Sequence, residues 1–497
     1  MIASGMIIPP RILLTITICI FSLGSLVSQS KAADEKNRPN ILFCIADDWG
    51  WPHASAYGDP VVKTPNFDRV AKKGVLFEHA YISSPSCTPS RNAILTGQYH
   101  WRLGAGANLW STLDVNTKTY PNVLAEAGYH IGSWRKSWGP GKLNEWTKAG
   151  KHPAGKVYNK GLPDFLSASP EGADFCFWLG ASDPHRGYKL GSGEASGIDL
   201  SKIELFPHFP DSPEIRGDVA DYYFEVQRFD GDVGKALEQL KAAGKLENTF
   251  VVITGDHGMP FPRCKSNLYD SGARVPLAIM WGDKIKPGRT ITDFVSTTDL
   301  APTFLELAGI PIPEEMTGKS LLPLLLSDKS GGEEGRDAVV FGKERHVPGQ
   351  EAPNMGGYPS RAIRTHEFLY IRNYEPDRWP NGTPNWEKAA IKRAWYADTD
   401  NGPTKTYIVN NKDKDEAHRQ AYQWNFGKRP AEELYDCRKD PGQLVNLADD
   451  PAFADQKAEL AKRMDSVLSE SNDPRATGGG SLLSERTLSI RFASSAF

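Results

Sequence analysis

Two unbroken apolar runs that end in aspartates constrain the fold of this chain more than any other feature. Ile41–Ala46 is followed by Asp47 and Asp48, and Thr249–Gly255 is followed by Asp256. Such runs are typical of a parallel sheet buried on both faces, and open α/β sheets bind ligands at the carboxyl ends of their strands. In a solvated loop neighbouring carboxylates need no partner, but at the end of a buried strand they repel each other unless a cation is bound. The runs therefore predict an α/β protein with a divalent cation at Asp47, Asp48 and Asp256.

Length and charge limit the classes of protein that fit this pattern. The chain has 497 residues, enough for a large domain and a smaller one, and its 39% hydrophobic and 24% charged residues are ordinary for a globular protein. The formal net charge of −3 offers no basic excess to neutralise phosphates, which excludes a typical nucleic-acid-binding protein. An anionic substrate would have to be attracted by a local group of cations.

The first 33 residues have the pattern of a secretory signal peptide. Arg11 precedes the apolar run Ile12–Phe21, and small residues end at Ala32 and Ala33. A membrane anchor is the alternative, but Thr, Ser and Gly interrupt the apolar segment, which favours cleavage over spanning. No later stretch of the sequence is long and apolar enough to cross a bilayer. We therefore predict an exported protein of a periplasmic, secreted or lysosome-like compartment, with no membrane span after cleavage.

A thiol, a proline and a guanidinium stand close together in the segment Ser86–Gly97. The hydroxylated residues before Pro89 suit the N-terminus of a helix. Cys87 would then lie beside unpaired backbone N–H groups, where an anion is stabilised, and Arg91 would add a planar fork that binds oxyanions. A capped turn with a buried structural cysteine is the alternative interpretation.

The string C-T-P-S-R-x-x-x-L-T-G that begins at Cys87 resembles the signature of type I sulfatases. In that family a maturation enzyme oxidises the cysteine to formylglycine, and one hydroxyl of the hydrated aldehyde attacks sulfur. The second hydroxyl then releases sulfate, a step that an unmodified thiol could not complete. The resemblance implies that a formylglycine-generating enzyme matures Cys87 and that Arg91 orients the hydrate.

Two later segments extend this resemblance. Asp183–Arg186 reads D-P-H-R, as in the branch of the family near the heparan N-sulfatases (the N-sulfoglucosamine sulfohydrolase type). In that branch the position of His185 contacts sulfate and can protonate the leaving group, a role suited to imidazole; a structural histidine is the alternative. The run that begins at Lys265 resembles the family pattern K-x-x-x-Y-(E/D)-x-G-x-R-x-P, so Lys265 matches a sulfate-binding lysine.

The segment after Gly128 departs from the family at one position. Sulfatases commonly carry G-K-W-H-L-G there, and its lysine and histidine both face the sulfate. Alignment on Gly128 and Tyr129 places Lys136 at the lysine and Trp138 at the histidine. A solvated surface lysine is the alternative for Lys136, but the alignment favours a contact with sulfate. The alignment also predicts that the contact usually made by histidine is missing.

The resemblance runs from about Asn40 to Leu447 and implies the fold. We expect an α/β, alkaline-phosphatase-like sandwich in which helices flank a large mixed or parallel sheet, with a smaller C-terminal α+β subdomain. A charged, Gly-rich linker near residues 327–336 would separate a catalytic domain at 34–330 from a subdomain at 337–475. Residues 476–497 are Gly- and Ser-rich, which predicts a disordered tail.

The resemblance also implies a cofactor and a set of site residues. One calcium ion per chain would be bound by the matured Cys87 together with Asp47, Asp48, Asp256 and His257. Lys136 and Lys265 would bind the sulfate, and His185 or Lys265 would protonate the leaving group. Glu344–His346 lies between predicted C-terminal strands, where the corresponding loop of related enzymes reaches toward the substrate sugar. His346 is therefore a candidate substrate contact, and a surface charge cluster is the alternative.

Together these segments predict a sulfatase that hydrolyses sulfate esters or sulfamates of a sulfated oligo- or polysaccharide. A phosphoesterase or phosphonate hydrolase on the same fold is one alternative, and a non-catalytic secreted glycan-binding protein is another. O-sulfated algal polysaccharides and N-sulfated glucosamine stay open as substrates.

Overall fold

The two apolar runs form neighbouring parallel strands at the centre of a large sheet. In this computed structural model, which describes Met1, residues 38–392 and residues 394–478, β1 (Asn40–Ala46) pairs with β6 (Thr249–Gly255) along its whole length. On its other side β1 pairs in parallel with β5 (Phe175–Gly180). Every residue of β1 and β6 is buried, which confirms the predicted parallel core.

Over the described residues this sheet has eight strands in the order β4-β3-β5-β1-β6-β7-β2-β8. Its strand β7 is antiparallel to both neighbours and the other pairs are parallel, so the sheet is mixed. The remaining strands are β2 (Val75–Tyr81), β3 (His130–Trp134), β4 (Lys156–Val157), β7 (Leu277–Met280) and β8 (Arg289–Ser296).

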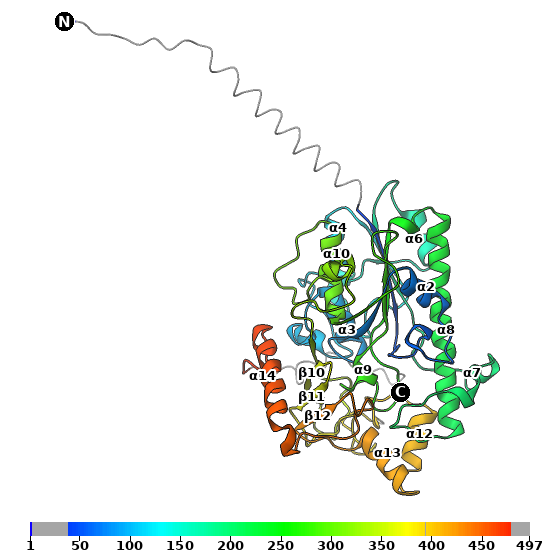
Figure 1. The fold of residues 1–497 in the computed structure, drawn as a ribbon, viewed down its shortest axis with the longest axis vertical. Helices are drawn as coiled ribbons and strands as arrows, with labels where there is room; N and C mark the ends of the chain where they lie inside the picture. The colour runs from blue at the N-terminus through cyan, green and yellow to red at the C-terminus, as the bar shows by residue number, and fades with distance from the viewer. Residues whose placement is uncertain (2–37, 393, 479–497) are drawn as a thin grey trace. The chain divides into compact units, whose positions relative to one another are not determined.

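Helices cover both faces of the large sheet because side chains alternate along each strand. The helices on these two faces include α2 (Pro65–Lys73), α3 (Cys87–Thr96), α4 (Tyr120–Glu126), α6 (Leu162–Ala168), α8 (Pro213–Ala242) and α10 (Leu300–Leu307). On β1, Leu42 and Cys44 share a hydrophobic cluster with α2 and α8. Ile41 and Phe43 share another with α3, α4 and α10. Figure 1 shows these two groups of helices on opposite sides of the strands.

Short helices lie in the connections between these elements and in the C-terminal part. They are α5 (Asn144–Lys148), α7 (Ser192–Ala195), α9 (Asp270–Ala273), α11 (Leu322–Leu326), α12 (Pro403–Asn410) and α13 (Glu416–Phe426). The long helix α8 begins at a capped position, because Ser212 Oγ accepts a hydrogen bond from the backbone N–H of Ile215 and Pro213 follows the cap.

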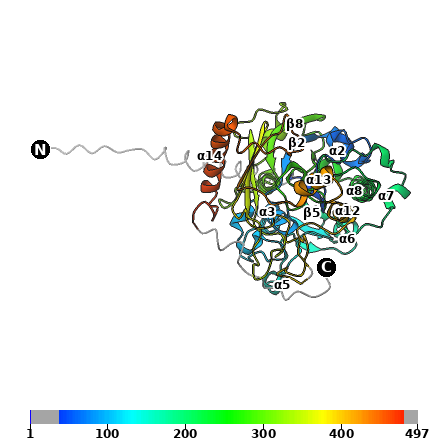
Figure 2. The same ribbon diagram turned by 90° about the horizontal axis from the view of Figure 1, so that it is seen from below.

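A second, antiparallel sheet forms the C-terminal part, in the order β12-β11-β10-β9. Its strands are β9 (Ala338–Lys343), β10 (Ser360–Thr365), β11 (Phe368–Asn373) and β12 (Glu432–Asp436). One face, with Phe341 and Leu369, joins the hydrophobic cluster that contains α3 and α10. The other face packs against α14 (Ala454–Glu470), as Figure 2 shows from below. The smaller C-terminal α+β unit is therefore confirmed.

Several predictions on chain organisation fall at the edge of the described residues or beyond it. The signal peptide at residues 1–33 and most of the tail at 476–497 lie outside them. The division at the linker stays a prediction, because the described residues from Asn40 onward form one compact unit. Among the described helices, none combines the length and apolarity that crossing a membrane requires.

Candidate active site

The carboxyl ends of β1 and β6 bring four predicted ligands together. Because Ala46 pairs with Gly255, Asp47 and Asp48 after β1 lie beside Asp256 and His257 after β6. We call these four residues the strand-end cluster: Asp47, Asp48, Asp256 and His257. All four are almost completely buried. Asp48 adopts a left-handed backbone with φ of 73°, and its N–H donates to Asp256 Oδ1 at 2.9 Å, so the two strand ends are tied directly.

Cys87 lies at the first position of α3 and faces this cluster. Its Sγ is 3.2 Å from His257 Nε2, and its side chain is buried. The predicted helix N-terminus is therefore confirmed, with Ser86 as the capping residue in extended conformation. Burial raises the pKa of the Cys87 thiol well above its ordinary value, so the unmodified residue would be a protonated thiol and a poor nucleophile.

The donor atoms around Cys87 fit a hard divalent cation. Ligand atoms of Asp47, Cys87 and Asp256 lie within 4.8 Å of one another, and the same holds for Asp48, Cys87 and His257. Asp48 Oδ1 is buried, and no hydrogen bond from the described residues reaches it, although His257 Nε2 approaches it at 3.1 Å. His257 Nδ1 donates to the carbonyl of Gly258 at 3.0 Å, so in the neutral imidazole Nε2 carries the lone pair. Carboxylate oxygens and a lone pair that face one another are stabilised by a cation between them.

Arg91 holds the cluster together from within the protein. Its side chain is completely buried, and its Nε donates to Asp256 Oδ2 at 2.8 Å. Another nitrogen lies 3.4 Å from Asp47 Oδ1, and a third donates to the carbonyl of Lys136. Burial opposes the charge, but Asp256 and Asp47 raise the pKa of Arg91, which stays a cation. The predicted guanidinium fork is thus directed at two carboxylates.

Two predicted lysines line a cavity beside Cys87. Lys136 Nζ contacts both carboxylate oxygens of Asp47 at 2.6 Å, and Lys265 Nζ donates to Asp48 Oδ2 at 2.8 Å. Lys136 is therefore not a solvated surface lysine. Trp138 is not among the residues that line the cavity. Its indole N–H donates to Asn92 Oδ1 at 2.7 Å. Trp138, at the position where sulfatases usually carry histidine, therefore packs against α3.

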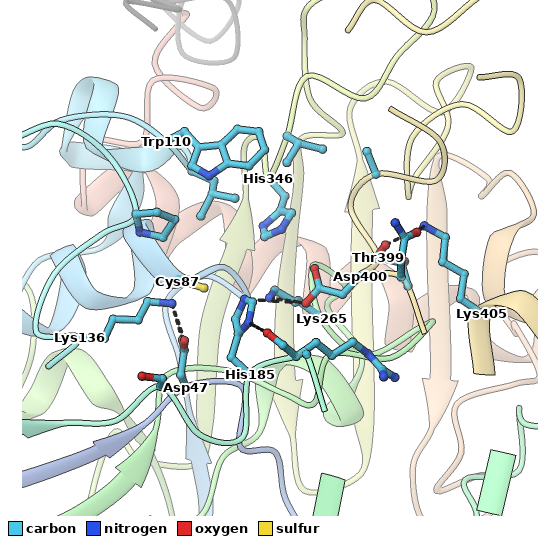
Figure 3. A pocket seen from close by; sticks show the side chains of 18 of the residues that line it. Asp47, Cys87, Trp110, Lys136, His185, Lys265, His346, Thr399, Asp400 and Lys405 are labelled. Atoms are coloured by element: carbon cyan, nitrogen blue, oxygen red, sulfur yellow. Dashed lines mark hydrogen bonds and ion pairs between the residues drawn. The ribbon is translucent and has the colours of Figure 1, made fainter. Parts of the chain in front are cut away.

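His185 points its Nε2 into the same cavity. Its Nδ1 donates to the carbonyl of Arg186, which fixes the ring, and Nε2 lies 4.0 Å from Asp48 Oδ2. Arg186 is itself held by two hydrogen bonds of 2.7 Å to the carboxylate of Asp218 on α8. Figure 3 shows His185 between Lys136 and Lys265, which come from different segments of the chain. The structure thus brings all the predicted sulfate contacts to one cavity.

The cavity has a volume of about 960 Å³, and loops form its other side. We call this side the loop wall: Leu109, Trp110, His346, Val347, Trp395, Ala397 and Asp400. His346 is buried there, and its Nδ1 lies 2.8 Å from Ser86 Oγ. Glu344 and Arg345 are also buried, so the interpretation of a surface charge cluster is wrong. The cause is tertiary, because Glu344 pairs with Arg361 and Arg475.

Asp400 and Trp110 are cavity residues that the sequence interpretation missed. Asp400 Oδ2 lies 2.9 Å from Lys265 Nζ and 3.9 Å from His185 Nε2. It follows no strand, and the run D-T-D-N-G that contains it has only the pattern of a turn. Trp110 stands in an irregular segment with a left-handed φ of 53°, a conformation that an aromatic residue seldom adopts. This strained backbone conformation beside the cavity is the structural signal that marks Trp110 as a candidate functional residue.

Comparison with known families decides the identity of the chain. A family model described as Sulfatase matches residues 39–176 and 142–310, which together span more than half of the chain. The chain belongs to the sulfatase family. A second family model, described as N-sulphoglucosamine sulphohydrolase, C-terminal, matches residues 255–380 of this sulfatase. The resemblance to the heparan N-sulfatase branch is therefore confirmed.

Relatives match most of the length of this sulfatase. Human N-sulphoglucosamine sulphohydrolase is 29% identical over 497 residues, covering 90% of this chain and 93% of the human protein. An ulvan-active sulfatase of Formosa agariphila is 29% identical over 465 residues, covering 90% of this chain and 83% of that protein. The solved structure of BT4656 in complex with its substrate D-glucosamine-2-N,6-O-disulfate matches with a TM-score of 0.58 and 19% identity, over 88% of this chain and 98% of that one. The fold is thus the predicted alkaline-phosphatase-like one, and the family makes the chain a sulfuric ester hydrolase.

Proposed function

We propose that this sulfatase is exported and removes sulfate from a sulfated glycan, with formylglycine at position 87 and one calcium ion. The observation that carries the proposal is the position of Cys87. It contacts the strand-end cluster and lines the cavity at whose surface Lys136, Lys265 and His185 converge. Cations from separate segments around one buried thiol are the arrangement that an anionic ester requires.

Two groups would have to be supplied to the chain. Formylglycine, made from Cys87 by a maturation enzyme, would provide a hydrated aldehyde as the nucleophile. A calcium ion held by the strand-end cluster would provide positive charge for the sulfate oxygens. Arg91 would keep Asp47 and Asp256 in place for this ion, as its hydrogen bonds indicate.

The remaining residues would bind sulfate and move a proton. Lys136 and Lys265 each carry an ammonium group at the cavity surface, where they would contact the sulfate oxygens. His185 Nε2 or Lys265 Nζ would protonate the leaving atom. The cavity of about 960 Å³ has room for sugar as well as sulfate. Relatives named for N-sulphoglucosamine and for ulvan support a sulfated sugar, with either a sulfamate or a sulfate ester as the scissile group.

The test begins with co-expression of the full chain and a formylglycine-generating enzyme. We expect mass spectrometry to find formylglycine at position 87 and ion chromatography to find sulfate released from defined sulfated oligosaccharides. Cys87→Ala should lose at least about 10⁴-fold in activity, because no other side chain supplies the nucleophile. Cys437→Ala, at the end of β12 and outside the cavity, is the matched control and should keep full activity. Active enzyme that carries only intact thiol would refute the proposal.

Two further measurements address the ion and the class of ester. Dialysis against a calcium chelator should lower activity at least about 100-fold, and added calcium should restore it. Aryl sulfates should be hydrolysed faster than the matching aryl phosphates. The reverse order would favour the phosphoesterase alternative on the same fold.

A further inference from the structure

Asp400 is a carboxylate on the loop wall, in a cavity where Lys136, Lys265 and His185 converge as proposed contacts of an anion. Its side chain is 24% exposed, and its Oδ2 accepts a hydrogen bond from Lys265 Nζ at 2.9 Å. The same oxygen lies 3.9 Å from His185 Nε2. A free carboxylate here would repel sulfate, so its presence needs a reason that outweighs this cost.

The contacts of Lys265 supply the first part of that reason. Its ammonium lies between two carboxylates, Asp48 Oδ2 at 2.8 Å and Asp400 Oδ2 at 2.9 Å. Asp48, Asp400 and His185 offer donor atoms close enough for a metal ion, but Lys265 Nζ already supplies the positive charge between these carboxylates. If Asp48 held the proposed calcium ion, part of its charge would be taken by the ion. Asp400 would then remain as the full counter-charge of Lys265.

His185 supplies the second part. Since its Nδ1 hydrogen is directed at the carbonyl of Arg186, a proton to be transferred is carried on Nε2. That atom faces Asp48 and Asp400 at 4.0 and 3.9 Å, and Figure 3 shows it close to Asp400. Both groups able to protonate a leaving atom therefore face the same two carboxylate oxygens, and only that of Asp400 lies outside the proposed ligand set of the ion.

The turn that carries Asp400 is fixed on both sides. Lys405 Nζ donates to the carbonyl of Thr399 at 2.9 Å and to Asn401 Oδ1 at 3.0 Å, which are the two neighbours of Asp400. Asp398 accepts hydrogen bonds from Lys343 Nζ at 2.8 Å and from the backbone N–H of Val347 at 3.0 Å. A carboxylate on such a turn can define the position of more flexible lysine and histidine side chains.

We propose that Asp400 is a positioning residue for the proton donors of this sulfatase, Lys265 and His185. The inference rests on the proposed function. In the step concerned, an ionised hydroxyl of the hydrate proposed at position 87 would bond to sulfur while the bond between sulfur and the leaving oxygen or nitrogen breaks. The electron pair of the broken bond stays on the leaving atom. One proton moves to that atom from His185 Nε2 or Lys265 Nζ, and Asp400 keeps both donors aimed at it without giving or taking a proton.

The experiment compares variants on aryl sulfates whose leaving phenols differ in acidity, from 4-nitrophenyl sulfate to phenyl sulfate. These substrates carry no sugar hydroxyl, so a contact between Asp400 and a sugar cannot affect them. Nitrophenolate leaves without protonation, whereas phenol needs a proton in the transition state. We expect Asp400→Asn to lower kcat for phenyl sulfate about 100-fold and kcat for 4-nitrophenyl sulfate less than about 5-fold, with KM within about 3-fold for both.

Two more variants separate positioning from folding. Asp400→Glu keeps the carboxylate and should recover at least about a third of the activity on phenyl sulfate that Asp400→Asn loses. Asp398→Asn loosens the turn that carries Asp400 without removing its carboxylate, so it should lower the activity on phenyl sulfate more than that on 4-nitrophenyl sulfate, but less strongly than Asp400→Asn.

Other outcomes would overturn the assignment. Equal losses of Asp400→Asn on all aryl sulfates would make Asp400 a structural residue. A loss confined to sulfated sugars would make it a sugar contact. A matured wild-type enzyme that released no sulfate from any substrate would overturn the proposed function and this assignment with it. If the wild type is active and Asp400→Asn shows either of the two patterns above, only the assignment of Asp400 would be overturned.

Discussion

The strand-end cluster, which reaches the cavity through Asp47, and the loop wall belong to one site, yet they are built in opposite ways. Asp48 and Asp256 follow adjacent parallel strands, so the ladder between β1 and β6 sets the distance between them. Asp400 and Trp110 stand in irregular segments, held by contacts between side chains and backbone. The cluster gathers three buried carboxylates whose counter-charge comes from Arg91, Lys136 and Lys265, whereas the loop wall is held by separate contacts such as that of Asp400 with Lys265.

This difference predicts whether substitutions on each side should mainly reduce activity or mainly reduce stability. Substitution in the strand-end cluster should cost chemistry and little stability, because the ladder keeps the backbone in place. Substitution in the anchors of the loop wall should cost stability first, because side-chain hydrogen bonds such as those of Lys405 hold those loops. Four predictions test this contrast, from the largest effect to the smallest.

Asp48→Asn should nearly abolish sulfate release while leaving the fold intact. The amide nitrogen would replace Oδ1 and donate to His257 Nε2, which is now 3.1 Å away, and the amide oxygen would still accept from Lys265. We expect kcat/KM to fall about 10³-fold because a charged ligand is lost. The melting temperature without calcium should stay equal or rise, since one buried like charge is gone. A large fall in melting temperature, measured by calorimetry, would contradict the expectation that substitution in the strand-end cluster costs little stability.

Trp110→Ala should weaken the binding of sugars. The indole lines the cavity and packs beside Cys87 and Leu109, so it offers an apolar face to a sugar ring. We expect KM for a sulfated oligosaccharide to rise about 10-fold, and KM for 4-nitrophenyl sulfate to change less than about 3-fold. Trp386→Ala, at a side chain that is 55% exposed and outside the cavity lining, should change neither value. Equal changes for both substrates would remove Trp110 from sugar binding.

Lys405→Met should destabilise the protein more than it slows the reaction. Lys405 Nζ donates to the carbonyls of Trp395, Tyr396 and Thr399 at 2.9 to 3.0 Å, and methionine would leave these buried acceptors without it. We expect urea denaturation to show a loss of about 2–3 kcal/mol in the free energy of unfolding. Lys414→Met, at an exposed position, is the control and should change this free energy by less than about 0.5 kcal/mol. A loss no larger than that of the control would show that the turn is held by other contacts.

Acidification should remove one polar contact of a further loop, at residues 152–155. His152 Nδ1 accepts a hydrogen bond from the backbone N–H of Ala154 at 3.1 Å, and burial lowers the pKa of His152 to about 4. Since this pKa lies below the ordinary value of 6.5, the unfolded chain binds the proton first, and stability is lost as pH falls from about 6.5 to 4. We expect His152 to account for about 1–2 kcal/mol of that loss.

His152→Asn is the matched variant for this measurement. The asparagine Oδ1 can accept the same hydrogen bond from Ala154 and does not titrate. Its free energy of unfolding should therefore fall less than that of the wild type between pH 6.5 and 4. Parallel curves for the two proteins would show that His152 carries no such contribution.

Sequence patterns predicted one side of the cavity much better than the other. The apolar run before Asp47 and Asp48 and the signature around Cys87 correctly placed these residues at a strand end and at a helix N-terminus, because both kinds of position have local sequence signals. The alignment put Lys136 beside the cluster, which the structure confirms, and Trp138 at the usual histidine. Only the structure shows that Trp138 turns toward Asn92.

By itself the sequence determined the mixed α/β sheet, the family and the side chains that surround Cys87. Those features depend on periodicity and on residues next to regular elements, which are encoded locally. The tertiary structure decided that His346 is buried against Ser86 and that Asp400 reaches Lys265, across 135 residues of chain. Such contacts depend on how separate loops fold back onto the sheet, and no local pattern records that path. The sequence therefore specified the end of the cavity that we propose to hold sulfate, and the fold specified the end that would meet the rest of the substrate.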